Sequence, residues 1–146
     1  MLDGKGIRAL VSGCTLVRLI DRDDHSSAAV EQFETEGIRV LSRRQIESYL
    51  YDDEILIALC AKAGRPQDAV AVLADKQQAI GESIQRHNPA DDVKSAAGVI
   101  YTKTKQRLSL TSCGNDARSF ARDTLAPLMT TNTSVYKDLR AAIFGQ

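Results

Sequence analysis

The sequence predicts a small α/β unit at the N-terminus followed by a mostly α-helical C-terminal region. Two short apolar runs rich in branched side chains, at residues 14–20 and 38–41, are typical of buried parallel strands. A helical pattern separates them, and beyond the second run the apolar residues recur almost wholly at helical spacing. We therefore expect a parallel βαβ unit within residues 1–50 and helices over residues 51–146, which at this length can pack as one domain.

The predicted sheet is undersized. The first strand stops at the acidic run Asp-Arg-Asp-Asp of residues 21–24. A helix follows through about Glu36, with Ser26 or Asp24 as its N-cap and Gly37 at its end. Two short strands with one helix between them form a βαβ unit, but two strands do not make a stable sheet alone. Either the C-terminal helices cover this unit, or partner chains complete it, or it is one portion of a larger α/β domain, and we favour the last.

The later helices have recognisable start and stop signals. Ser42 is a suitable N-cap for a helix that docks through Tyr49 and Leu50, and Gly64 ends the helix after it. The remaining helices are expected to begin at or just after Pro66, Asn88-Pro89, Asn115 and Thr133. In the helix after Pro66, the apolar side chains at roughly helical intervals are Val70, Leu73, Ile80 and Ile84.

Composition excludes several classes of protein. Hydrophobic residues make up 43% and charged residues 26%, a balance that argues against disorder. The apolar runs are too short for a membrane span, and the N-terminus lacks the apolar core of a signal peptide, so we expect a cytoplasmic protein without a membrane partner. Three dispersed cysteines and two histidines do not provide a zinc site, and we expect the cysteines to be reduced.

Charge is unevenly distributed although nineteen basic and nineteen acidic residues cancel overall. Residues 1–92 contain eleven Lys/Arg and sixteen Asp/Glu, whereas residues 93–146 contain eight and three. One interpretation is that these are solvated faces of opposite sign that attract each other. The other is a phosphate-contacting surface, including Lys103 and Lys105, beside an acidic metal site.

The acidic run is the first candidate site. It follows a predicted strand, and ligands bind open α/β sheets at the carboxyl ends of the strands. Asp21 and Asp23 project to the same side of an extended segment, and a hard cation such as Mg²⁺ or Mn²⁺ relieves the repulsion between two such carboxylates. We include Asp24 as a further candidate ligand. The alternative is that these residues form a turn and cap the next helix.

The second candidate is Leu-Ser-Arg-Arg-Gln-Ile-Glu-Ser-Tyr-Leu, residues 41–50, which begins where the second strand ends. Because both parallel strands end at one edge of the sheet, Glu47 becomes a possible third carboxylate near the metal. Arg43 and Arg44 are then candidates to bind phosphate. The alternative is a helical ion pair between Glu47 and the preceding arginines.

Together, Leu-Ile-Asp-Arg-Asp-Asp and, about seventeen residues later, Val-Leu-Ser-Arg-Arg-Gln-Ile-Glu-Ser-Tyr-Leu resemble the TOPRIM region of OLD-family (overcoming lysogenization defect) proteins. These are ATP-dependent nucleases of phage defence and DNA processing, in which an ATPase precedes the TOPRIM domain. The resemblance covers residue 14 to about residue 56. This chain has Gln45 and Ser48 where the family commonly has Glu and Asn.

The resemblance implies that Asp21, Asp23 and Glu47 are catalytic, metal-binding carboxylates with Mg²⁺ or Mn²⁺ as cofactor. A complete TOPRIM domain also has an earlier strand that ends in glutamate, but no glutamate precedes Glu31 here. An ATP-binding GxxxxGK[ST] loop is also absent from the sequence. We therefore expect a partial or truncated TOPRIM-type unit that acts on nucleic-acid phosphodiesters and is inactive alone. Nucleic acid, an ATPase domain or subunit, and further copies of the chain are the expected partners.

Two alternatives remain open. Asp-x-Asp after a strand also occurs in haloacid-dehalogenase-like phosphatases, although Asp24-His25 does not match their usual continuation. The chain could instead be a non-catalytic helical interaction or oligomerisation module of a phage-defence or DNA-processing system.

Overall fold

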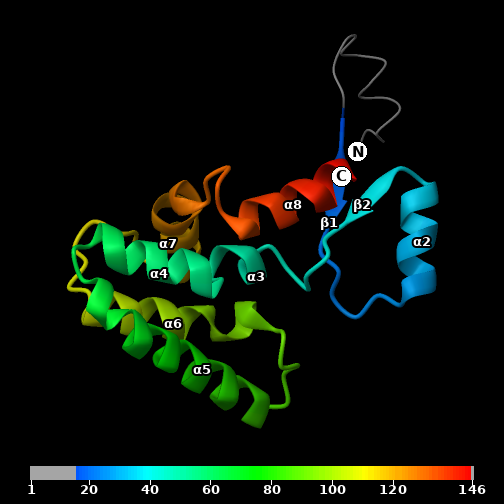
Figure 1. Cartoon of the computed structure of the whole chain (residues 1–146). Helices are drawn as coiled ribbons and strands as arrows, with labels where there is room; N and C mark the ends of the chain where they lie inside the picture. Colours follow the sequence, from blue (N-terminus) through cyan, green and yellow to red (C-terminus); the bar gives the residue numbers. More distant parts are fainter. Residues whose placement is uncertain (1–15, 146) are drawn as a thin grey trace.

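The computed structural model describes residues 16–145 and has a two-strand sheet at one end and a helical layer at the other (Figure 1). The α/β part consists of strand β1 (Arg18–Ile20), helix α2 (Ser27–Thr35) and strand β2 (Ile38–Val40). The two strands are parallel, with Leu19 opposite Arg39. The predicted βαβ unit is therefore confirmed over the described residues. β1 is shorter than the strand predicted at residues 14–20. Cys14 and Thr15 lie outside the described residues, and Leu16 and Val17 precede β1.

The helical part begins after β2. Its α-helices are α3 (Glu47–Leu50), α4 (Asp53–Lys62), α5 (Ala69–Gln85), α6 (Val93–Arg107), α7 (Ala117–Phe120) and α8 (Ser134–Phe144). Short 3₁₀ and π turns join some of them, at Pro66–Asp68, Ala121–Leu125 and Ala126–Leu128. Helices α5 and α6 lie side by side along the edge of the layer, and α8 runs back to the sheet (Figure 1).

The hydrophobic core lies in the helical part. Its cluster of buried residues starts at Leu41 and includes Ile55, Ile100 and Phe120, none of which is more than 1% exposed. Tyr51 also belongs to it, and its hydroxyl donates a hydrogen bond to the Ala117 carbonyl oxygen at 2.7 Å. Such a bond satisfies the one polar group that this buried ring carries.

Several helix limits differ from the predictions. Residues 42–46 form turns instead of the first helical turn, because the Ser42 hydroxyl bonds to the Tyr49 hydroxyl (2.8 Å) and caps no helix. Helix α6 starts at Val93, since the Asp92 side chain accepts a hydrogen bond from Ser95 N (3.2 Å). The predicted start at Asn88-Pro89 is therefore wrong. Likewise Asp116, one residue after the predicted Asn115, caps α7.

The inward face of α5 also differs from the prediction. Val70 is 80% exposed and Ile84 is 45% exposed, whereas Val72, Lys76 and Ala79 are buried. Lys76 reaches a carboxylate of Asp53 at 2.7 Å, which satisfies its charge at a mostly buried position.

Other sequence predictions are confirmed. Ser26 caps α2, Thr133 caps α8, and α4 ends just before Gly64, which has a positive φ of 72°. Cys60 and Cys113 are free and buried. Among residues 16–145, no helix is long and apolar enough to cross a membrane.

Candidate functional site

The two sequence motifs meet at the carboxyl ends of the strands. The acidic turn, defined as residues 21–24, lies against the loop after β2: the Asp23 amide donates a hydrogen bond to the Arg44 carbonyl oxygen at 3.0 Å. Asp23 adopts a positive φ of 43°, a conformation that aspartate tolerates better than most residues. The predicted approach of the two segments is therefore present.

Arg44 connects the acidic turn to the start of α6. Its guanidinium donates to Asp24 and to Asp91, each at 2.7 Å, and its side chain is only 11% exposed. The hydrogen bond from Arg44, and then its positive charge, hold the pKa of Asp24 below its usual value. The charges of Arg44 and Asp24 thus compensate each other. Arg44, a predicted phosphate ligand, and Asp24, a predicted metal ligand, are therefore already paired within the chain.

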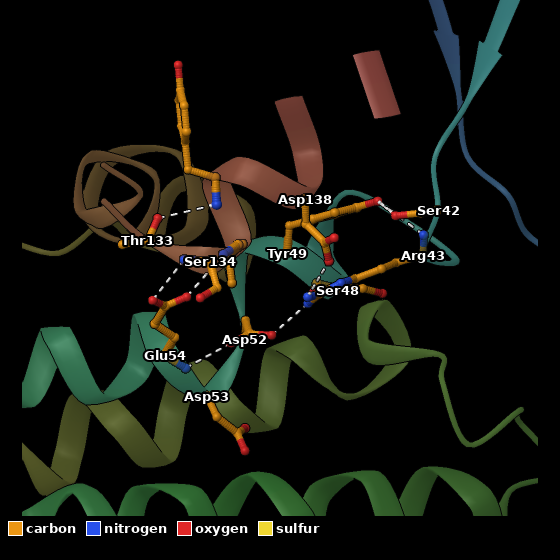
Figure 2. Close-up of polar contacts among 12 residues, drawn as sticks. Ser42, Arg43, Ser48, Tyr49, Asp52, Asp53, Glu54, Thr133, Ser134 and Asp138 are labelled. Atoms are coloured by element: carbon orange, nitrogen blue, oxygen red, sulfur yellow. Dashed lines mark hydrogen bonds and ion pairs between the residues drawn. The ribbon is translucent and has the colours of Figure 1, made fainter. Parts of the chain in front are cut away.

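Arg43 has an equally internal role (Figure 2). Its guanidinium donates to Asp52 at 2.6 Å, to the Ser48 carbonyl oxygen at 3.1 Å and to Asp138 at 2.9 Å. The same group lies 4.9 Å from the centre of the Tyr49 ring, a cation–π contact. Arg43 therefore joins the loop after β2 to α4 and α8.

The network around Arg43 continues to the start of α8. The Glu54 carboxylate accepts hydrogen bonds from the backbone amides of Ser134 and Val135, each at 3.0 Å (Figure 2). Carboxylates are favourable at a helix N-terminus because the amides there have no partner within the helix. A side chain of α4 thereby fixes the position of α8.

Asp21 and Asp23 differ from their neighbour Asp24. Within residues 16–145, neither side chain has a hydrogen bond or ion pair. Asp21 is partly buried and Asp23 is exposed. These are the two carboxylates of the acidic turn that remain available to a ligand.

Glu47 is not grouped with them. It opens α3, and its side chain lines a groove together with residues of α6 and α7. No three His, Cys, Asp or Glu side chains in the described part of the chain are placed to hold one metal ion. The predicted metal ligands were Asp21, Asp23, Asp24 and Glu47. Of these, the structure leaves Asp21 and Asp23 together and unpaired at the acidic turn within residues 16–145, and two carboxylates alone do not form a complete metal site.

Lys103 and Lys105 lie apart from the arginines. They are eleven and thirteen residues beyond the N-cap of α6, which corresponds to about 16–20 Å along the helix. The Lys105 ammonium lies over the Tyr101 ring, 5.7 Å from its centre. The four predicted phosphate contacts are therefore not one surface.

Two features of this region were not predicted from the sequence. Buried Gln45 joins the loop after β2 to α6, because its amide donates to Asp92 at 2.8 Å and its oxygen accepts from the Lys94 amide at 3.2 Å. The groove beside Glu47 was also missed. The basic excess after residue 92 was the one sequence signal that bears on it, since Lys94 and Arg118 line the groove.

Comparison of the chain with known proteins finds no matching family model, no similar curated protein and no similar solved structure.

Proposed function

We propose that the chain is the sheet-edge and helical end of a TOPRIM-type, Mg²⁺- or Mn²⁺-dependent nuclease, inactive alone and completed by a further segment or subunit. The observation that carries the proposal is the unfinished sheet. β1 pairs with β2 alone in the described chain; Leu19 within β1 is 37% exposed, and Val17 just before it is 36% exposed. A strand of this composition belongs inside a sheet, with neighbours at both edges.

The unpaired carboxylates give the proposed unit its chemistry. Asp21 and Asp23 follow β1, which has no second neighbouring strand among residues 16–145, at the end of the sheet where ligands collect. They would hold one side of a divalent cation, and the completing segment would supply a further carboxylate. The cation would stabilise charge on a phosphodiester of nucleic acid. An ATPase domain or subunit is the kind of partner that the OLD-family resemblance implies.

Binding of Mn²⁺ to the isolated chain, followed by electron paramagnetic resonance, tests the carboxylate pair. We expect the wild-type chain to bind one Mn²⁺ weakly and the double variant Asp21→Asn/Asp23→Asn to lose it. Asp24→Asn is the matched control. It removes a negative charge at the adjacent position, but the Asp24 carboxylate is already paired with Arg44. Absence of Mn²⁺ binding to the wild type would contradict the proposal.

A cleavage assay on plasmid DNA and structured RNA tests the claim of inactivity. The isolated chain with Mg²⁺ or Mn²⁺ should cleave neither substrate. Cleavage that disappears in Asp21→Asn/Asp23→Asn would show that no carboxylate is missing.

A second function is favoured by the internal pairing of Arg43 and Arg44. Because both guanidinium groups are engaged with carboxylates of the chain, the same geometry suits a helical interaction module that needs no metal. Light scattering after size exclusion separates the two: self-association without Mn²⁺ binding would favour the module.

A further inference from the structure

Outside the acidic turn, a groove between α3, α6 and α7 has a volume of ≈ 820 Å³. This is within the range of roughly 300–1,000 Å³ of small-molecule sites. Small residues form much of its lining: Ala97, Gly98, Ala117, Ala121 and Ala126. The wall formed by α6, α7 and the turns after α7 thus carries few bulky side chains, which suits a flat ligand.

Glu47 lines the groove with an unsatisfied oxygen. Its Oε2 atom is buried and has no hydrogen-bond partner in the described chain. The nearby Tyr51 hydroxyl is not available, because it donates to the Ala117 carbonyl oxygen at 2.7 Å. A buried carboxylate oxygen without a partner is unfavourable, so a ligand that donates an N–H group to it would gain binding free energy.

The rest of the polar lining is positive. Lys94 and Arg118 are exposed at the groove, and within residues 16–145 neither side chain forms an ion pair or hydrogen bond. Arg122 also lines it but is paired with the adjacent Asp123 at 2.7 Å. One partly buried carboxylate with an unpaired oxygen thus lies beside two uncompensated cations, an arrangement suited to a ligand with N–H donors and a separate negative group.

From this arrangement we infer that the groove binds a nucleotide. The base would lie on the small residues and donate to Glu47, while the phosphate would contact Lys94 and Arg118. A basic peptide fits less well, because the two free cations repel it. The same chemistry could come from a free mononucleotide or from an unpaired nucleotide of a nucleic-acid strand. The inference does not rest on the proposed nuclease function, since it uses neither Asp21 nor Asp23 and no metal.

Glu47 also predicts which base is preferred. A carboxylate accepts from amino and imino groups on the pairing edge of a base. Guanine presents two adjacent donors there, whereas uracil presents one N–H between two carbonyl oxygens that a carboxylate repels. Binding should therefore be tightest for GMP and weakest for UMP.

Calorimetric titration with GMP, AMP, CMP and UMP in the presence of EDTA tests the inference independently of any metal site. We expect GMP to bind about tenfold or more tighter than UMP. Glu47→Gln should reduce this ratio towards one, because the new amide donates as well as accepts. Arg118→Ala should weaken all four nucleotides by a similar factor, whereas Arg86→Ala, an exposed arginine at the end of α5, should change none.

A groove-filling variant and its control test the inference independently of whether the other variants fold. A Cβ atom at Gly98 meets no atom within 4 Å, so Gly98→Leu should fold and occupy the groove. Gly81→Leu on α5 is its control, with equal freedom from contacts. We expect Gly98→Leu to abolish GMP binding without lowering the melting temperature, and Gly81→Leu to retain it.

Single-stranded oligonucleotides distinguish the two sources. Tighter binding of an oligonucleotide with an unpaired terminal guanosine than of GMP indicates a strand end, and equal binding indicates a free nucleotide; both support the inference. It is overturned if the wild type binds no nucleotide at millimolar concentration. It is equally overturned if all four bind alike and Glu47→Gln changes nothing.

Discussion

The α/β part and the helical part of this chain differ in how completely they are packed. In β1, Arg18 and Leu19 are exposed, and between residues 16 and 40 no residue belongs to the buried core cluster. The helical part encloses Ile100, Phe120 and Leu125 completely. The stability of the chain therefore resides mainly in the helices, while β1 retains apolar surface that the described chain does not cover.

The largest contrast should come from core truncation in each part. Phe120 is fully buried between the Tyr51 and Tyr101 rings, so Phe120→Ala should lower the free energy of unfolding by about 3–5 kcal/mol. Leu19→Ala, at a side chain that is 37% exposed, should cost less than about 1 kcal/mol. Urea denaturation followed by circular dichroism measures both, and equal losses would contradict the proposed division of stability.

Two glycines with positive φ give the second contrast. A Cβ atom at Gly114 (φ 94°) would lie 2.7 Å from the backbone nitrogen of Phe120, so Gly114→Ala combines backbone strain with a clash. We expect a loss of about 2–5 kcal/mol. Gly37→Ala (φ 78°) has the same strain but no atom within 4 Å, and should cost about 1 kcal/mol. Thermal unfolding of both variants checks the difference.

The contact between the two parts can be weakened at Arg43. Arg43→Met keeps the aliphatic stem but removes the bonds to Asp52 and Asp138, and should destabilise the chain by about 1–2 kcal/mol. Hydrogen exchange should speed up in α8 and in the loop after β2. Asp138→Asn, which affects only the more exposed of the two pairs, should have a smaller effect; an equal effect would assign the main contact to Asp138.

The smallest expected effect is on the pKa of Asp24 in the acidic turn. Because Arg44 lowers the pKa of Asp24, this pair stabilises the fold above the ordinary aspartate pKa of about 3.9. That contribution is lost as the pH falls through the lowered folded-state value. In carboxyl NMR titrations, Arg44→Met should return the pKa of Asp24 towards about 3.9, and Arg43→Met should leave it low. An unchanged pKa in Arg44→Met would mean that the pair does not form in solution.

The strands and the helix between them could be predicted because their signals are local. Branched apolar runs mark β1 and β2, and the Ser26 hydroxyl caps α2 at the amide three residues later. The inward face of α5 could not be predicted in the same way. Val70 looks like a core residue by composition, yet buried Lys76 faces the layer because Asp53 of α4 is there to pair with it.

The candidate site was predictable only in part, for the same reason. The meeting of the acidic turn with the loop after β2 follows from parallel strands. The partners of the two arginines do not, since Asp91 is 47 residues from Arg44 and Asp138 is 95 residues from Arg43. The position of Glu47 in the groove likewise depends on α6 and α7, which no spacing within residues 41–50 encodes.

The course of α8 has a practical consequence. Held at its start by Glu54, this helix returns to the strands (Figure 1). Gly145 then lies against the Arg39 guanidinium of β2. A fluorophore attached by a short tether after Gly145 would therefore sit next to β2 at the end of the sheet. Its emission would report the arrival of a complementing polypeptide while leaving the nucleotide groove untouched.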